Sequence, residues 1–169
     1  MKKTQVVIIG SADDTKHYDI AYAIGSFIAK NGWILITGGR TGVMEAASKG
    51  AHDHGGIVVG ILPFDRFDGA NNYCDIVIPT GIGFARNSMN VLSADVVISI
   101  GGKAGTLTEL AYAWHYGKPI ISCVFTGGWS KRIVAEPIDD RNNGSNIYPA
   151  HSLEEVFDIL GKLLNKPST

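Results

Sequence analysis

One short glycine-rich pattern occurs twice in the sequence, and both copies could bind an anion. The copies are Gly38-Gly39-Arg40-Thr41-Gly42 and Gly101-Gly102-Lys103-Ala104-Gly105. Each follows an apolar run typical of a β-strand and precedes a stretch typical of a helix. Glycines at such a turn allow a positive φ and a close approach to a ligand, while the free N–H groups of the following helix favour a negative charge. With Arg40 and Lys103 beside them, the loops predict a ligand that carries phosphate.

Two common nucleotide-binding motifs do not fit these loops. Neither the G-x-G-x-x-G spacing of dinucleotide-binding folds nor the G-x-x-x-x-G-K-[ST] spacing of Walker loops occurs in the chain. The glycines could instead serve only to make tight turns between strand and helix. A single glycine would be enough for a turn, however, and two turns would not both need a basic residue, so we favour anion binding.

Length and composition indicate one α/β domain. The chain has 169 residues, of which 45% are hydrophobic, and its 21 glycines suit a fold with many tight turns. We assign residues 1–165 to this domain and expect residues 166–169 to fray. The net charge of −1, with lysines and arginines scattered along the chain, argues against a nucleic-acid partner.

The apolar runs also bear on the cellular compartment. Cys74 and Cys123 each lie in or beside such a run, which favours buried free thiols over a disulfide framework. The run from Val6 to Ile9 is too short for a signal-peptide core, and no run approaches the length of a membrane span. We therefore expect a cytoplasmic protein without a membrane partner.

Strands and helices are predicted to alternate along the chain. This alternation predicts a single-domain, doubly wound, mainly parallel sheet with helices on both faces. The expected strands are Gln5–Gly10, Trp33–Thr37, Gly56–Leu62, Asp75–Pro79, Asp95–Ile100 and Pro119–Phe125. The expected helices cover about residues 16–30, 42–52, 84–93, 106–116 and 152–164. Residues 126–144 are assigned to turn and loop, because they mix Gly, Asp and Asn with only a short helical pattern.

This topology places the chemically interesting residues together. In a doubly wound sheet, ligands bind at the carboxyl ends of the strands, where both glycine loops fall. The first strand ends there too, at Gly10-Ser11, and the loop from Pro63 to Tyr73 is expected to frame the same site.

Several of these residues carry a resemblance to a known family. The run from Gly101 to Glu109, the first glycine loop and Ala85-Arg86-Asn87 resemble the Lonely-guy-like superfamily of Rossmann-type proteins, often misnamed lysine decarboxylases. Within it, the chain is most similar to the molybdenum cofactor carrier proteins. The similarity extends from Gly10-Ser11 to the strand after Pro119. It implies a Rossmann-like fold and a phosphorylated heterocyclic ligand.

The resemblance also implies roles for single residues. Lonely-guy enzymes are phosphoribohydrolases with a Pro-Gly-Gly-x-Gly-Thr-x-x-Glu signature and an upstream arginine, which correspond here to the run ending at Glu109 and to Arg86. Gly101 stands in place of the signature proline, Lys103 in place of its second glycine, and Asn87 where these enzymes usually carry lysine. The predicted binding residues are Gly10, Ser11, Gly38, Gly39, Arg40, Gly42, Arg86, Asn87, Gly101, Gly102, Lys103, Ala104, Gly105, Thr106 and Glu109. Arg86 and Glu109 are catalytic only if the protein is a hydrolase.

Some candidate residues could have purely structural roles. Thr106-x-x-Glu109 matches a capping box, so Glu109 could simply close backbone N–H groups at the start of a helix. Asp13 and Asp14 are expected to cap the first helix. His52-Asp53-His54 could suggest metal binding, but no third ligand is near in the sequence, so we predict no metal site.

Three functions follow from these observations. The first is a carrier of a phosphorylated heterocycle, either molybdenum cofactor or a nucleotide. The second is hydrolysis of a nucleoside 5′-monophosphate, and the third is a nucleotide-sensing regulatory protein. The carrier ranks first because Gly101 and Lys103 differ from the signature of the enzymes. The helices after Arg86 and Thr106 carry much apolar surface, which predicts a homo-oligomer, either dimer or tetramer.

Overall fold

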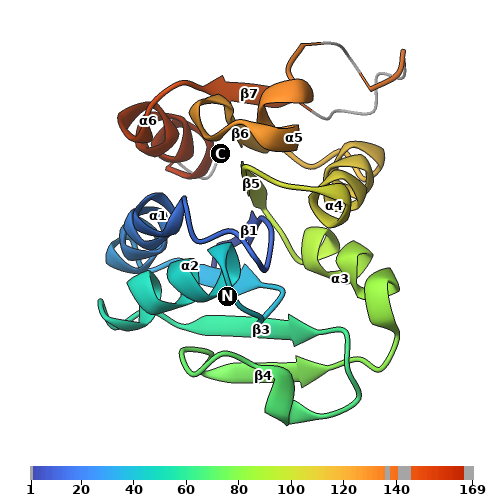
Figure 1. Ribbon diagram of the computed structural model, residues 1–169. Coiled ribbons are helices and arrows are strands. Elements are labelled where there is room, and N and C mark those ends of the chain that lie inside the picture. The colour runs from blue at the N-terminus through green and yellow to red at the C-terminus, as the bar shows by residue number, and fades with distance from the viewer. Residues whose placement is uncertain (1, 136–137, 141–145, 166–169) are drawn as a thin grey trace.

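The computed structural model describes residues 2–135, 138–140 and 146–165, and this part of the chain forms a sheet of seven parallel strands (Figure 1). The strand order is β4-β3-β2-β1-β5-β6-β7. The strands are β1 (Gln5–Ile9), β2 (Ile34–Thr37), β3 (Val58–Leu62), β4 (Ile76–Pro79), β5 (Val96–Ile100), β6 (Ile120–Cys123) and β7 (Ile147–Ala150). The predicted doubly wound parallel sheet is therefore confirmed.

Helices cover both faces of the sheet. They are α1 (Tyr18–Lys30), α2 (Val43–His52), α3 (Asn87–Leu92), α4 (Ala104–His115), α5 (Gly128–Arg132) and α6 (Leu153–Leu164), with short 3₁₀ turns η1 (Phe67–Gly69), η2 (Gly83–Arg86) and η3 (Val124–Thr126). Figure 1 shows α1, α2 and α6 on one side of the sheet and α3 and α4 on the other. No helix in the described ranges is long and apolar enough to cross a membrane.

The two hydrophobic cores follow from the alternation of side chains along each strand. Val6 and Ile8 of β1 point into the core beneath α1, α2 and α6, whereas Val7 and Ile9 point into the core beneath α3 and α4. All four side chains are at most 1% exposed. Because both faces of the central strands are covered, these strands read as continuous apolar runs, as expected for a parallel sheet.

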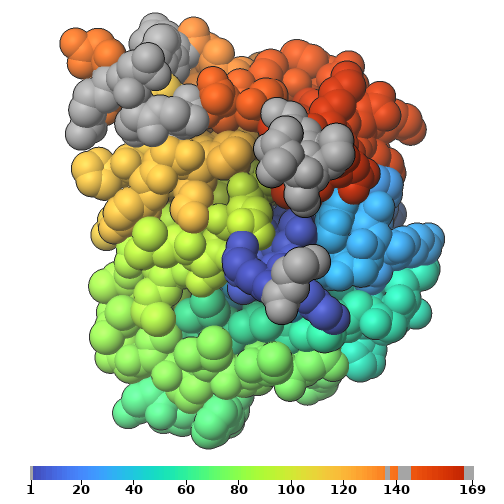
Figure 2. Space-filling model, turned by 180° about the vertical axis from the view of Figure 1, so that it is seen from behind, coloured from blue at the N-terminus to red at the C-terminus, as the bar shows by residue number. Residues whose placement is uncertain are grey.

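The strand order reverses at β1, which pairs with β2 on one side and β5 on the other. The loops that leave β1 and β5 therefore run to opposite faces of the sheet and open a crevice at their carboxyl ends. Figure 2 shows the molecule from behind, where the dark blue start of the chain lies near the middle of the face, between light green and light blue parts of the chain. There Lys2 pairs with Asp95, the residue before β5.

Several predicted boundaries were wrong. The helix predicted over residues 84–93 divides into η2 and α3, and α1 begins at Tyr18 instead of Lys16. The segment assigned to turn and loop over residues 126–144 contains α5, whose five residues follow Gly127 and begin with Gly128, both at positive φ. Residues 136–137 and 141–144 of that segment, and the predicted frayed tail 166–169, lie outside the described residues.

Strand β7 was not predicted. It contains Pro149, which cannot donate a ladder hydrogen bond and is tolerated mainly in edge strands. β7 is indeed an edge strand that pairs only with β6 in the described sheet. The N-cap predicted at Ser152 is confirmed, since Ser152 Oγ accepts a hydrogen bond from the backbone N–H of Glu155, while the Glu155 carboxylate accepts from His151, one residue before the position that a capping box requires.

Candidate functional site

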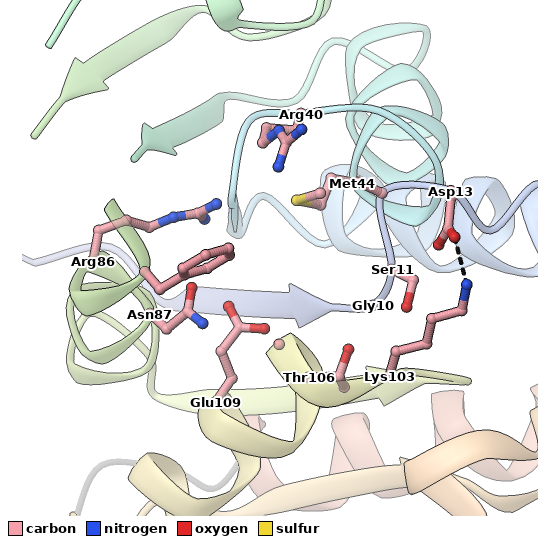
Figure 3. Close-up of a pocket in the computed structure, with 13 residues that line it drawn as sticks. Gly10, Ser11, Asp13, Arg40, Met44, Arg86, Asn87, Lys103, Thr106 and Glu109 are labelled. Carbon is pink, nitrogen blue, oxygen red and sulfur yellow. Dashed lines mark hydrogen bonds and ion pairs between the residues drawn. The ribbon is translucent and has the colours of Figure 1, made fainter. Parts of the chain in front are cut away.

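A cavity of about 210 Å³ lies at the crevice between β1 and β5 (Figure 3). It collects residues from four loops: the end of β1, the loop after β2, the turn η2 with the start of α3, and the start of α4. The lining residues are Gly10, Ser11, Ala12, Asp13, Arg40, Met44, Phe84, Arg86, Asn87, Lys103, Gly105, Thr106 and Glu109. Nine of these were predicted as binding residues, namely Gly10, Ser11, Arg40, Arg86, Asn87, Lys103, Gly105, Thr106 and Glu109.

The start of α4 presents unused hydrogen-bond donors to this cavity. Lys103 is the N-cap residue, but no side chain caps the first turn of the helix. Thr106 is 2% exposed, and its hydroxyl has no hydrogen-bond partner among the described residues. Buried donors without partners are rare in native proteins, which favours a role for this hydroxyl in binding a ligand. A helix N-terminus with a free hydroxyl beside it suits a phosphate group.

The structure rules out the capping-box interpretation of Thr106 and Glu109. Because α4 begins at Ala104, both residues lie inside the helix, and neither caps its first turn. Instead, Glu109 Oε1 accepts a hydrogen bond from Asn90 Nδ2 of α3 at 2.8 Å. The side chain of Glu109 therefore faces α3 and the cavity and leaves the backbone of its own helix uncapped.

Arg86 is a buried cation with an unused donor. Its side chain is 6% exposed, and its Nε has no partner within the described ranges. Burial lowers the pKa of the guanidinium, an effect that Glu109 opposes and Arg40 reinforces. The salt bridges of the described chain include none between Arg86 and Glu109. The guanidinium therefore remains available to a ligand.

Gly38 explains how Arg86 reaches its position. A Cβ atom added to Gly38 would overlap Nη1 of Arg86 and would lie 2.6 Å from the sulfur of Met44. The first glycine loop thus makes room for the arginine of η2. The loop is held in turn by Asn71, whose backbone N–H donates to Gly39 O at 2.8 Å and whose Nδ2 donates to Arg40 O at 2.9 Å. The segment from Pro63 to Tyr73 therefore holds the first glycine loop, although none of its residues is among those that line the cavity.

Glu109 is a titratable group of the cavity whose pKa is strongly raised by its surroundings. Its side chain is buried, and this desolvation raises its pKa to about 7, although Asn90 and Arg86 both act to lower it. A carboxyl group with a pKa near neutrality can exist in either protonation state at physiological pH. It can thus donate or accept a hydrogen bond toward a ligand.

Lys103 and Asp13 differ from their predicted roles. Lys103 Nζ forms an ion pair with Asp13 Oδ2 at the edge of the cavity, where both side chains are largely exposed (Figure 3). The lysine holds the pKa of Asp13 below its usual value. The prediction that Asp13 caps α1 was wrong, because the N-cap residue is His17. Asp14 is not the N-cap of α1 either, although its Oδ1 accepts a hydrogen bond from the backbone N–H of His17 at 3.2 Å.

The remaining predicted residues shape the loops without lining this cavity. Gly39, Gly42, Gly101 and Gly102 all have positive φ, which a side chain would disfavour. Gly42 is the N-cap of α2, and Ala104 begins α4.

Four residues line the cavity without having been predicted to bind, and they are Ala12, Asp13, Met44 and Phe84. Phe84 could have been suspected, since a large aromatic residue precedes Arg86 by two positions in a turn. Ala12 and Met44 carry no comparable signal, because small and apolar residues at these positions are typical of any helix or turn.

Gly105 gives the first prediction, because the protein itself has no evident need for glycine there. Nothing lies within 4 Å of a Cβ built on it, and its φ is not positive. Gly105→Ala should raise the free energy of unfolding by about 0.5–1 kcal/mol, the usual gain in a helix. The new methyl group would nevertheless enter the space of a phosphate, so ligand affinity should fall at least ~10-fold, or about 1.4 kcal/mol.

Gly161→Ala is the matched control, because Gly161 lies within α6 and its nearest added contact is at 3.8 Å. It should raise stability similarly while leaving affinity unchanged. Denaturant unfolding and titration calorimetry with a nucleotide measure the two effects. Equal affinity in both variants would show that no ligand approaches Gly105.

Comparison with known proteins assigns the family. The profile of the SLOG cluster4 family matches residues 3–157. The chain belongs to the SLOG cluster4 family. A protein of Archaeoglobus fulgidus that carries no functional name is 47% identical to this chain over 123 residues. The matched residues are 72% of this chain and 81% of the relative.

Two further relatives carry functional names. A cytokinin riboside 5′-monophosphate phosphoribohydrolase of Mycobacterium marinum is 33% identical over 102 residues, 59% of this chain and 54% of the enzyme. The SLOG cluster4 chain thus spans about half the length of that enzyme. The molybdenum cofactor binding protein of Rippkaea orientalis matches the structure with a TM-score of 0.85 and 37% identity, covering 97% of this chain and 99% of the other.

A molybdenum cofactor carrier protein of Chlamydomonas reinhardtii is similar over nearly its whole length as well. It matches with a TM-score of 0.82 and 31% identity, covering 97% of this chain and all of the other. The resemblance seen in the sequence, to Lonely-guy-like proteins and to the carrier branch in particular, is therefore confirmed. The fold of the SLOG cluster4 chain is shared with the carrier proteins.

Proposed function

We propose that this protein binds and carries a phosphorylated heterocyclic ligand, either molybdenum cofactor or a nucleotide. The observation that carries the proposal is the convergence of three unused donors on one cavity: the uncapped N-terminus of α4, the Thr106 hydroxyl and Arg86 Nε. A phosphorylated ligand that fills the cavity would accept from all of them, with its phosphate at the start of the helix. The similarity to proteins named for molybdenum cofactor binding and carriage supports the choice of ligand.

The rest of the lining suits the remainder of such a ligand. Phosphate would lie at the start of α4, while Arg86, on the other side of the cavity in Figure 3, would donate to another acceptor of the same ligand. Met44 and Phe84 supply a polarisable sulfur and an aromatic ring, which favour contact with a flat heterocycle. Asn87 and Glu109 can hydrogen-bond to its polar edge.

Titration calorimetry with isolated molybdopterin and with AMP tests this proposal. Binding of either compound, competed by inorganic phosphate, is the expected result. Failure of both compounds to bind, at concentrations that saturate a typical carrier, would overturn it. The free cysteines Cys74 and Cys123 favour a reducing compartment, and we propose a cytoplasmic location on that ground.

One observation favours hydrolysis of a nucleoside 5′-monophosphate as the second candidate. Glu109, with a pKa of about 7, could act as an acid or base while Arg86 holds the substrate. Release of free base from a panel of nucleoside monophosphates, abolished by Glu109→Gln, would support hydrolysis. If the wild type binds the panel without releasing base, the carrier function stands.

We also propose that the protein is a homo-oligomer. Some apolar residues that led us to expect this, such as Val91, Leu110 and Ala113, are buried within the chain. Met89 and Leu92 of α3 are exposed, however, and so is Phe84, at 81%. These residues adjoin Arg86 in the sequence, so a contact through them would place a second subunit near the site.

Light scattering should therefore report at least twice the chain mass of 18.0 kDa. Leu92→Glu places a charge in the proposed contact and should shift the particle toward a single chain. Ile76→Glu, at a similarly exposed position on the edge strand β4, is the control for a charge that replaces an exposed aliphatic side chain. A wild type that remains a monomer at micromolar concentration would contradict the proposal.

A further inference from the structure

A second cavity adjoins the first across the start of α4. It measures about 410 Å³, and it shares Ser11, Asp13 and Lys103 with the first cavity. The first is smaller than the roughly 300–1,000 Å³ typical of small-molecule sites, whereas the two together lie within that range. Gly105 and Thr106 line the first cavity, while Gly101 and Gly102 line the second. The proposed phosphate position at the helix start thus lies between two spaces.

The boundary between the cavities is an ion pair that a ligand could displace. Lys103 and Asp13 are largely exposed, and exposed pairs of this kind contribute little to stability. If Lys103 turned from Asp13 to a bound phosphate, it would exchange one anionic partner for another. The spaces on its two sides would then join.

The second cavity contains an Asp–His pair that the proposed function does not use. His17 Nδ1 lies 2.7 Å from Asp14 Oδ2, and both side chains are mostly buried, at 12% and 14% exposed. The pair is set against Gly101, since a Cβ there would lie 2.9 Å from Asp14 Oδ2. Because Asp14 engages Nδ1, Nε2 is the ring nitrogen left for a ligand in the cavity.

The charges of this second lining indicate what it would bind. Asp13 and Asp14 bring two carboxylates to it, and Lys16 and Lys103 bring two cations, so the lining has no excess of positive charge to favour a further phosphate group. Carboxylates and an imidazole nitrogen are instead suitable partners for sugar hydroxyls and base edges. The space therefore fits a polar, uncharged group attached to the far side of the phosphate.

We infer that the protein's ligand has two parts joined through phosphate, as in a dinucleotide, and that His17 contacts the second part. This inference rests on the proposed function, because it places the phosphate at the start of α4. A simple monoester would fill only the first cavity. A phosphodiester or diphosphate with a nucleoside on each side would fill both, with the second nucleoside held by His17 and Asp14.

The test compares AMP with diadenosine diphosphate by titration calorimetry. The wild type should bind diadenosine diphosphate at least about tenfold more tightly than AMP. His17→Asn retains a donor near Asp14 and a favourable N-cap residue, but it removes Nε2. It should abolish this advantage while changing the Kd of AMP less than about twofold.

Two further variants keep the test independent of folding. Thr15→Trp, at an exposed position in the rim of the second cavity, should obstruct the second nucleoside without affecting AMP. His52→Asn, on the exposed end of α2, should leave both affinities unchanged. The inference would be overturned if the wild type bound the two probes equally. It would also be overturned if His17→Asn and Thr15→Trp both still bound diadenosine diphosphate more tightly than AMP. Either result would leave the proposed function standing. Failure of both probes to bind the wild type would remove the inference together with the nucleotide form of the proposed function.

Discussion

Replacing Arg86 with glutamine should weaken the binding of a phosphorylated ligand about 100-fold, or near 3 kcal/mol, which is the upper range for a hydrogen bond to a charged group. The guanidinium is 6% exposed and has an unused Nε donor beside the cavity. A buried donor without a protein partner is the arrangement in which a ligand oxygen gains most, because leaving its hydrogen bond unmade costs free energy. Titration calorimetry with AMP or molybdopterin measures the change.

The stability of the variant separates a binding role from a structural one. In the ligand-free protein, Arg86 is a buried charge without an ion-pair partner in the described chain, so its removal should not lower the free energy of unfolding by more than about 1 kcal/mol. Arg132→Gln, an exposed arginine over the Trp129 ring, is the control and should leave affinity unchanged. A variant that unfolds readily but binds normally would indicate that Arg86 serves the fold.

Glutamine at position 109 should remove a pH dependence of stability. Burial raises the pKa of Glu109 to about 7 in the folded protein, above the ordinary value of 4.5. The folded state therefore binds more protons than the unfolded state between these values, and its stability falls as pH rises through this window. The free energy of unfolding of Glu109→Gln, relative to that of the wild type, should therefore rise by about 2–3 kcal/mol between pH 5 and pH 8.

Urea unfolding at pH 5, 6, 7 and 8 measures this difference. Glu154→Gln replaces an exposed carboxylate in the first turn of α6 and is the control. Its free energy of unfolding should change with pH between 5 and 8 as that of the wild type does. In the Arg86→Gln background, the fall in stability should occur at higher pH, because Arg86 acts to lower the pKa of Glu109. Parallel curves for the wild type and Glu109→Gln would show that Glu109 titrates normally.

The fold was predictable because its signals are local. Val96–Ile100 is apolar at every position except Ser99, which indicates a central parallel strand covered on both faces. The glycine pairs that follow β2 and β5 then had to lie at the carboxyl ends of those strands. β7 escaped prediction because Pro149 and its position at the edge remove the usual pattern.

The site was less predictable because its contacts join distant parts of the chain. That Arg86 occupies the space above Gly38 depends on the packing of η2 against the first glycine loop, and no spacing in the sequence encodes it. Asp13 looked like a helix cap because the competing partner, Lys103, comes from another loop. Arg86 and Glu109 were paired only through the family resemblance.

The structure also accounts for one departure from the phosphoribohydrolase signature. Gly101 stands where that signature has proline, and its φ is +55°, which the ring of proline cannot adopt. Any side chain at this position would also approach the Asp14–His17 pair. The loop in this protein is thus built differently at the point where the two cavities meet.

Native mass spectrometry of the protein, purified without denaturation, tests the central claim most directly. The wild type should carry a small molecule above the 18.0 kDa mass of each chain, and that molecule should release phosphate on fragmentation. The adduct should be absent from Arg86→Gln and retained in Arg132→Gln. A bound molecule without phosphate, or an adduct equally abundant in Arg86→Gln, would contradict a phosphate site at the start of α4.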